Sequence, residues 1–156
     1  MIRPVSYATI LEDPNWPALL AEYSAECALP ELGEPSPQRG LYELLEKSGG
    51  FQAFGEYQLH FDEDRAETVE KLVGFACVLI YSLPHYGTKI ATSESIFVSS
   101  RWRNTIAGIE VREAIKEHAI QSGCVAFLYT APKGSQFDKL LDMTCRHTNN
   151  VYLEAL

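Results

Sequence analysis

Residues 98 to 109 have the types and spacing of a site for a phosphate or pyrophosphate group. Extended apolar sequence ending at Val98 gives way to a helical pattern whose first turn contains Gly108, although glycine in a helix costs about 1 kcal/mol. Backbone N–H groups at a helix start lack helical partners, and with the helix dipole they attract anions. Arg101 and Arg103 add positive charge there. The alternative is that Gly108 only lets the helix pack closely on a sheet and that the arginines are solvated.

A strand, a helix and a second strand must hold this junction in place. We expect a strand from Glu94 to Val98, a long helix ending at Ser122 before Gly123, and a buried strand over 124–130. Such a crossover unit makes its two strands parallel. The run Leu72–Tyr81 is apolar on both faces, which is typical of a central strand.

The N-terminal half predicts helices and one half-exposed strand. Asn15 is placed to cap a helix with an apolar stripe running to Cys27. Five Pro or Gly residues in 30–40 predict a surface loop, and a short helix over 41–47 follows it. From Phe51 to His60 apolar and polar residues alternate, which predicts a strand near an edge of the sheet with one face in water.

The C-terminal segment predicts one more helix and one more strand. Ser135 and Asp138 resemble a capping box that opens a helix through Cys145, and 150–156 should form a last strand. That strand could pair across a homodimer or close the sheet.

Composition limits the classes of function. At 156 residues, with 46% apolar and 22% charged residues, the chain is expected to form one domain over 1–156. The net charge of −8 argues against a nucleic-acid surface. The scattered cysteines, and the lack of an apolar run long enough to span a membrane, suggest a cytoplasmic protein with reduced thiols. The four histidines show no metal-ligand spacing, so we expect no metal.

The acidic residues are concentrated in one segment. Residues 12–70 contain 14 of the 21 acidic side chains and three basic ones, a formal charge of −11. A solvated acidic face that keeps the protein soluble is one interpretation.

The sequence resembles the GCN5-related N-acetyltransferase (GNAT) superfamily. The signature of that family is Arg or Gln, two residues, Gly, one residue, then Gly or Ala, where a strand enters a helix. Arg103 and Gly108 match its first and last positions, while Ile106 stands where the first glycine is usual. The preceding Glu94-x-Ile96-x-Val98 also fits. The resemblance implies an α/β (α+β) fold with a mixed, mostly antiparallel central sheet, a parallel β-α-β cofactor crossover and helices on both faces.

The resemblance also implies a donor, acetyl-coenzyme A, and residues that hold it. Phe97 and Val98 would pair with the pantetheine arm like an added strand. The backbone N–H groups from Arg103 to Ile109 would bind the pyrophosphate; these are the amides of Arg103, Asn104, Thr105, Ile106, Ala107, Gly108 and Ile109.

Acetyl transfer to an amine requires a base and a donor for the developing oxyanion. By resemblance, Glu94 would be the base or position the acceptor, and the Val98 N–H would be the oxyanion donor; otherwise Glu94 is an exposed strand-end glutamate. By resemblance, relatives carry a tyrosine that acts as the acid at the position of Asp142. Tyr152 is the expected substitute and Tyr129 the other candidate, unless both are packing aromatics.

The expected acceptor is a cationic amine, either a small molecule or a protein lysine or N-terminus. In proteins of this type the N-terminal helices border the acceptor, and here that region is strongly acidic. A non-catalytic protein with the same fold remains the alternative, and a longer acyl donor is a third possibility.

Overall fold

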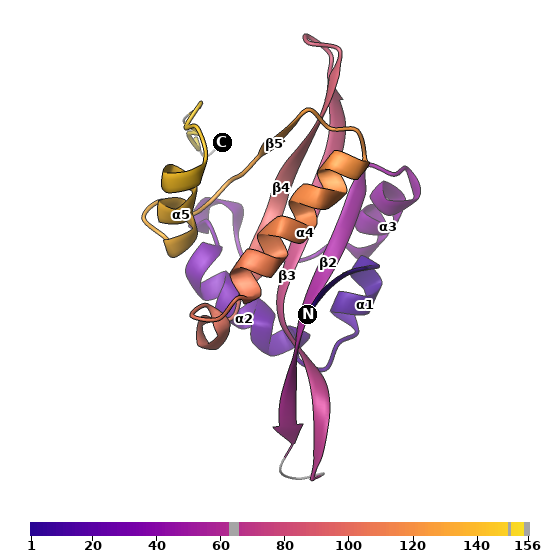
Figure 1. Ribbon diagram of the computed structural model, residues 1–156, viewed down its shortest axis with the longest axis vertical. Helices are drawn as coiled ribbons and strands as arrows, with labels where there is room; N and C mark the ends of the chain where they lie inside the picture. Colours follow the sequence, from indigo (N-terminus) through magenta and orange to yellow (C-terminus); the bar gives the residue numbers. More distant parts are fainter. Residues whose placement is uncertain (63–65, 150, 155–156) are drawn as a thin grey trace.

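The computed structural model describes residues 1–62, 66–149 and 151–154. Its centre is one five-stranded sheet with the order β1-β2-β3-β4-β5 (Figure 1). The strands are β1 (Ile2–Val5), β2 (Phe51–Asp62), β3 (Glu67–Leu83), β4 (Thr88–Val98) and β5 (Ala126–Leu128). All neighbouring pairs are antiparallel except β4–β5, which is parallel.

Helices cover both faces of the sheet. Three of them, α1 (Tyr7–Leu11), α2 (Trp16–Cys27) and α3 (Arg39–Lys47), lie on one face, and α4 (Ala107–Gln121) crosses the other (Figure 1). The short α5 (Gln136–Thr144) lies beyond β5, and single turns of 3-10 helix occur at Pro30–Leu32 and Ser100–Trp102. None of the described helices is long and apolar enough to cross a membrane.

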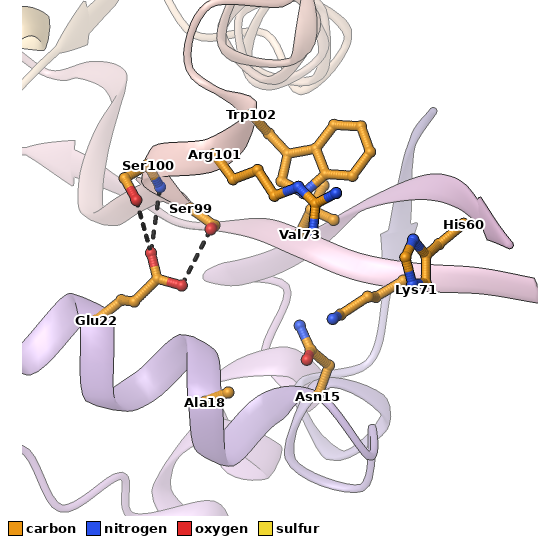
Figure 2. A pocket seen from close by; sticks show the side chains of 10 residues that line it. All are labelled: Asn15, Ala18, Glu22, His60, Lys71, Val73, Ser99, Ser100, Arg101 and Trp102. Carbon is orange, nitrogen blue, oxygen red and sulfur yellow. Dashed lines mark hydrogen bonds between the residues drawn. The ribbon is translucent and has the colours of Figure 1, made fainter. Parts of the chain in front are cut away.

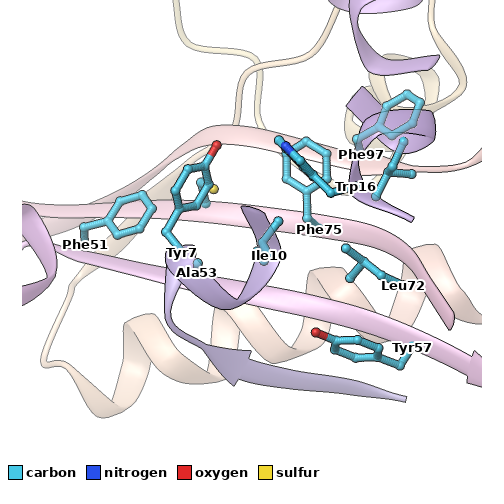
Figure 3. Packing of buried hydrophobic residues seen from close by; sticks show 11 residues of the cluster. Tyr7, Ile10, Trp16, Phe51, Ala53, Tyr57, Leu72, Phe75 and Phe97 are labelled. Carbon is cyan, nitrogen blue, oxygen red and sulfur yellow. The ribbon is translucent and has the colours of Figure 1, made fainter. Parts of the chain in front are cut away.

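Two clusters of buried side chains hold the helices to the sheet because alternate residues of β3 point to opposite faces. Phe75 and Cys77 belong to the cluster under α1 and α2, whereas Ala76 and Val78 belong to the cluster under α4. The first cluster is aromatic: Phe75 lies 5.2 Å from Trp16, measured between ring centroids, in an edge-to-face arrangement (Figure 3). Burial of both faces explains the continuous apolar run of β3.

Most of the expected elements are confirmed. The helices α2, α3, α4 and α5 and the central β3 occur where their patterns place them, and β4 and β5 are parallel. Gly123 has a φ of +76°, the left-handed conformation expected after a helix end. The Ser135 hydroxyl accepts from the Asp138 N–H, as a capping serine should.

Four expectations were wrong in part. Asn15 occupies the cap position of α2, but its side chain donates to Leu72 O instead. Glu56, expected on the wet face of β2, is 0% exposed because β1 and α4 cover it. The strand expected over 124–130 is an edge strand only three residues long, with Ala126 and Leu128 exposed. Residues 151–154 are not in a strand, and the rest of the expected last strand lies outside the described residues.

The aromatic cluster generates the first prediction. Replacing Phe75 by Ala should lower the free energy of unfolding by about 3–5 kcal/mol, because the cavity is closed in by the rings of Trp16, Tyr23 and Phe97. Urea unfolding measures the change. The matched control is Phe61→Ala, where the ring is exposed and the loss should stay below about 1 kcal/mol. Equal losses in the two variants would contradict this packing.

Candidate active site

The outer edge of β4 is open over its second half. Strand β5 pairs with β4 only from Ile90 to Thr92. One residue further, Thr130 extends the contact by donating its N–H to Ser93 Oγ at 2.9 Å. Beyond Ser93 no described strand pairs with this edge, although β3 stays paired with β4 on the other side as far as Val98. Parallel strands that separate in this way leave an edge to which an extended ligand can add.

Glu94 stands at the point where the two strands separate. In the β3–β4 register Cys77 pairs with Ser95 and Val78 with Ser93, so Glu94 is the extra residue of a β-bulge. A bulge bends its strand and redirects a side chain, and bulges are frequent beside active sites. The bulge therefore accounts for the direction of the Glu94 carboxylate, which reaches Tyr42.

The main chain of Val98 faces the open edge. The N–H of the next residue, Ser99, donates to Val73 O at 2.8 Å on the β3 side. In an antiparallel ladder successive residues face opposite edges, so the N–H and C=O of Ile96 and Val98 turn outward, while those of Phe97 turn toward β3. The side chain of Phe97 is buried in the aromatic cluster.

Tyrosines from the N-terminal helices surround the Glu94 carboxylate. The Tyr42 hydroxyl on α3 donates to Glu94 Oε1 at 3.2 Å, and the Ser95 hydroxyl donates to Oε2 at 2.8 Å. Burial, and then the nearby Glu94 charge, raise the pKa of Tyr23 to about 12, and the same two causes raise the pKa of Tyr42. These phenols are therefore protonated donors at neutral pH. A carboxylate held by two hydroxyl groups on an acidic surface is suited to a cationic amine.

The connection from Ser99 to Ile109 retains unused backbone donors. The amides of Thr105 and Ile109 donate to Trp102 O and Ile106 O, and the Ala107 amide donates to the Thr105 hydroxyl. Four amides of the segment, those of Arg101, Asn104, Ile106 and Gly108, have no acceptor among the described residues, and the last three lead into α4. They lie at the start of the 15-residue helix α4, which has no side-chain cap. This is the arrangement of an anion site at a helix N-terminus.

Neither Gly108 nor Ile106 obstructs this helix start. A Cβ added at Gly108 would meet nothing within 4 Å, so close packing on the sheet is not why glycine stands there. Ile106 has a φ of −74° and its side chain is 64% exposed, so a β-branched residue is unstrained at this point. Isoleucine at this position therefore introduces no backbone strain at the start of α4.

Arg103 is committed within the protein and is not a free cation. Its Nε donates to Val98 O at 2.7 Å, and its guanidinium pairs with the Glu26 carboxylate at 2.7 Å. The same group lies 5.0 Å above the Phe97 ring. These contacts tie the end of β4 to α2, so the Arg103 side chain supports the loop. Its backbone N–H, expected to bind the pyrophosphate, donates to Ser100 O at 3.4 Å.

The two tyrosines considered as acids have different surroundings. Tyr129 is half-buried, stacked on Phe127 at 4.3 Å, with the Arg112 guanidinium 5.9 Å from its ring. Burial raises the pKa of Tyr129 and Arg112 opposes that rise. Tyr152 is 85% exposed in the C-terminal segment, and Asp142 is exposed on α5.

Sequence reasoning missed Tyr42 and Tyr23 as neighbours of Glu94. Their only signal was helical periodicity, which is equally typical of a core position. The bulge that brings Glu94 to them depends on the pairing of β3 with β4, which no local pattern encodes.

Comparisons with known proteins identify the fold. No protein-family model and no curated protein matches the sequence. Solved structures do match: a ribosomal-protein-alanine N-acetyltransferase from Brucella melitensis biovar Abortus 2308 superposes with a TM-score of 0.67 at 16% identity, covering 100% of this chain and 99% of that chain.

Two further structures agree. An aminoglycoside acetyltransferase from an uncultured soil metagenomic sample, in complex with sisomicin, gives 0.67 at 15% identity, covering 100% of this chain and 95% of that one. A glucosamine-6-phosphate N-acetyltransferase from Arabidopsis thaliana gives 0.64 at 17%, covering 100% and 96%. The chain has the fold of the GNAT superfamily. Identities this low establish the fold alone.

Two glycine substitutions test the backbone of this region. Gly108→Ala should leave the free energy of unfolding unchanged or raise it by up to about 1 kcal/mol, because alanine favours a helix and meets no atom. Gly74→Ala should lower it by about 1–3 kcal/mol, because the new Cβ would lie 2.8 Å from Phe97 O. Urea unfolding of both variants decides, and a destabilised Gly108→Ala would mean that this glycine is structural.

Proposed function

We propose that the chain is a single acyltransferase domain that moves the acetyl group of acetyl-coenzyme A to a primary amine. The observation that carries this proposal is the continuity of two features: the open main-chain edge at Ile96 and Val98 leads directly to the unused amides of Asn104, Ile106 and Gly108. A ligand with an extended amide-bearing arm and a pyrophosphate meets both. Coenzyme A has that form.

Each group has a role in the proposed transfer. The amides at the start of α4 hold the pyrophosphate, and the pantetheine arm lies along the open edge of β4. Pairing was expected at Phe97 and Val98, but the Phe97 main chain faces β3 and the Val98 C=O accepts from Arg103, which leaves the Val98 N–H. The thioester carbonyl then lies beside the Val98 N–H, which stabilises the oxyanion formed when the amine attacks. Glu94 removes the proton of the amine directly or through water. The departing thiolate takes a proton, for which Tyr129 and Tyr152 are the candidate donors.

The proposed acceptor is a cationic amine, on a small molecule or a protein. Its binding is supported by the Glu94 carboxylate and by the acidic segment 12–70, which contains α2 and α3. The neighbours named above are described as acting on an alanine of a ribosomal protein, an aminoglycoside and an aminosugar phosphate, all of which are amines. The absence of a membrane-spanning helix among the described residues is compatible with a cytoplasmic location. A homodimer is still a prediction, but the last strand that was expected to pair across it is not formed by residues 151–154.

A non-catalytic role is the second candidate. It is supported by two observations: the Arg103 side chain is engaged in an ion pair with Glu26 and a hydrogen bond to Val98 O, and isoleucine stands at position 106. Such a protein would keep the fold without using the donor, so the donor must be tested first.

Binding of coenzyme A tests the donor site. Titration calorimetry should show saturable binding, and Gly108→Asp should raise the Kd at least about tenfold because a carboxylate would face the pyrophosphate. An acidic residue suits a helix start, so the variant should remain folded. Ile120→Asp, at an exposed position near the other end of α4, is the control and should leave the Kd unchanged. No binding at millimolar coenzyme A would leave only the non-catalytic role.

Turnover tests Glu94. With acetyl-coenzyme A and a panel of amines, thiol release by Glu94→Gln should fall about 10²- to 10⁴-fold in kcat, since the base is lost while the shape is kept. The Kd for coenzyme A should stay within about twofold, because Glu94 does not line the proposed pyrophosphate site. Tyr42→Phe should give a smaller loss. Full activity of Glu94→Gln would remove Glu94 from the chemistry, and faster turnover of neutral or acidic acceptors would refute the cationic acceptor.

A further inference from the structure

A polar cavity lies on the face of the sheet that carries α2, apart from the open edge of β4. Its volume is about 240 Å³, and it is lined by the first half of α2, by His60, Lys71 and Val73 of strands β2 and β3, and by the turn Ser99–Trp102 (Figure 2). This volume is below the roughly 300–1,000 Å³ of pockets for drug-sized ligands and far above that of one water molecule. The cavity therefore suits a small polar group.

Two cations face this cavity without a carboxylate partner. Figure 2 shows the Lys71 ammonium and the Arg101 guanidinium turned toward the same space. Among the described residues neither forms an ion pair, whereas Arg3, Arg39 and Arg103 are each held by a glutamate within 3 Å. In a chain with 21 acidic and 13 basic residues, two unpaired cations that converge on one cavity form a distinct positive site.

The one carboxylate at the cavity is already engaged. Glu22 accepts hydrogen bonds from Ser99 Oγ at 3.0 Å and from the Ser100 N–H at 3.1 Å. It thereby fixes the turn that carries Arg101, and its single negative charge stands against the two cations that line the same cavity. The Asn15 amide donates to Leu72 O at 2.6 Å, which fixes the start of α2 at the rim. These hydrogen bonds fix the backbone on two sides of the cavity.

We propose that this cavity binds the phosphate group of a small molecule, at a site separate from the proposed acetyl-coenzyme A site. A guanidinium and an ammonium on one cavity suit a doubly charged phosphate better than a single carboxylate. The start of α2 adds the positive end of its dipole. The site is separate because the hydroxyl of Ser99 meets Glu22 on the α2 face, while the unused amides begin α4 on the opposite face.

The two sites share a connection along the chain. Trp102 lines the cavity, and its C=O accepts from the Thr105 hydroxyl at 2.6 Å and from the Thr105 N–H at 3.2 Å. Thr105 in turn accepts from the Ala107 amide at the start of α4. A phosphate bound to Arg101 would restrain the turn that leads into the proposed donor loop.

Titration with inorganic phosphate tests the site. The chain has two tryptophans, so in ¹⁵N-labelled protein at constant ionic strength the Trp102 indole N–H should shift saturably while the buried Trp16 indole serves as reference. Arg101→Gln and Lys71→Gln should each raise the phosphate Kd at least about fivefold. Arg39→Gln and Lys116→Gln, at exposed positions paired with glutamates elsewhere, are the matched controls and should leave it unchanged.

Three outcomes would overturn the proposal. These are a Trp102 shift that does not saturate, an unchanged Kd in both cavity variants, and equal loss in the controls, which would indicate general screening. A further arm repeats the titration with coenzyme A present: a phosphate Kd within about twofold supports separate sites, whereas competition shows that the cavity is part of the donor site and refutes the separation. If coenzyme A does not bind at all, the proposed acetyl transfer fails while the phosphate arms still decide the cavity.

Discussion

The early end of the β4–β5 ladder is the constraint on which the rest of the site depends. Three residue pairs join the strands, and the contact through Ser93 and Thr130 ends it. The bulge at Glu94 comes at the next residue, and from there β4 follows β3 while its outer edge is left unpaired. Unpaired main-chain groups are a liability on an ordinary edge strand, because they can pair with another chain. Here they lead into a helix start with unused amides, which gives the opening a use.

The polar network around the opening explains why it keeps its shape. Arg103 joins Val98 O to Glu26 of α2, and Glu22 of the same helix holds Ser99 and Ser100. Two glutamates one turn apart on α2 therefore brace the turn that follows β4. Other acidic residues of the N-terminal segment also form ion pairs within the protein: Glu12 and Glu43 pair with Arg39, and Glu70 pairs with Arg3. The acidic residues of this segment therefore hold other elements in place as well as forming a solvated surface.

The two faces of the sheet divide the proposed tasks. Tyr42, which packs against the aromatic cluster under α1 and α2, donates its hydroxyl to Glu94, and the same face carries the cavity at Lys71 and Arg101. The opposite face carries α4, whose first turn presents the unused amides. A donor bound at α4 and an acceptor bound beside α3 would thus meet across the open edge of β4.

The sequence by itself determined the elements whose signals are local. The apolar run of β3, the helical pattern of α4 with Gly123 after it and the serine cap of α5 each need only neighbouring residues, and so does the strand-to-helix change near Arg103. Only the tertiary structure decided what lies beside what. Glu56 is buried although it alternates with apolar residues, because β1 and α4 cover its face. The contact of Glu94 with Tyr42 brings together residues 52 positions apart, and Lys71 and Arg101, 30 positions apart, line one cavity. The bulge at Glu94 depends on the pairing of β4 with β3. Pairing and packing bring such residues together, and a local pattern carries no information about either.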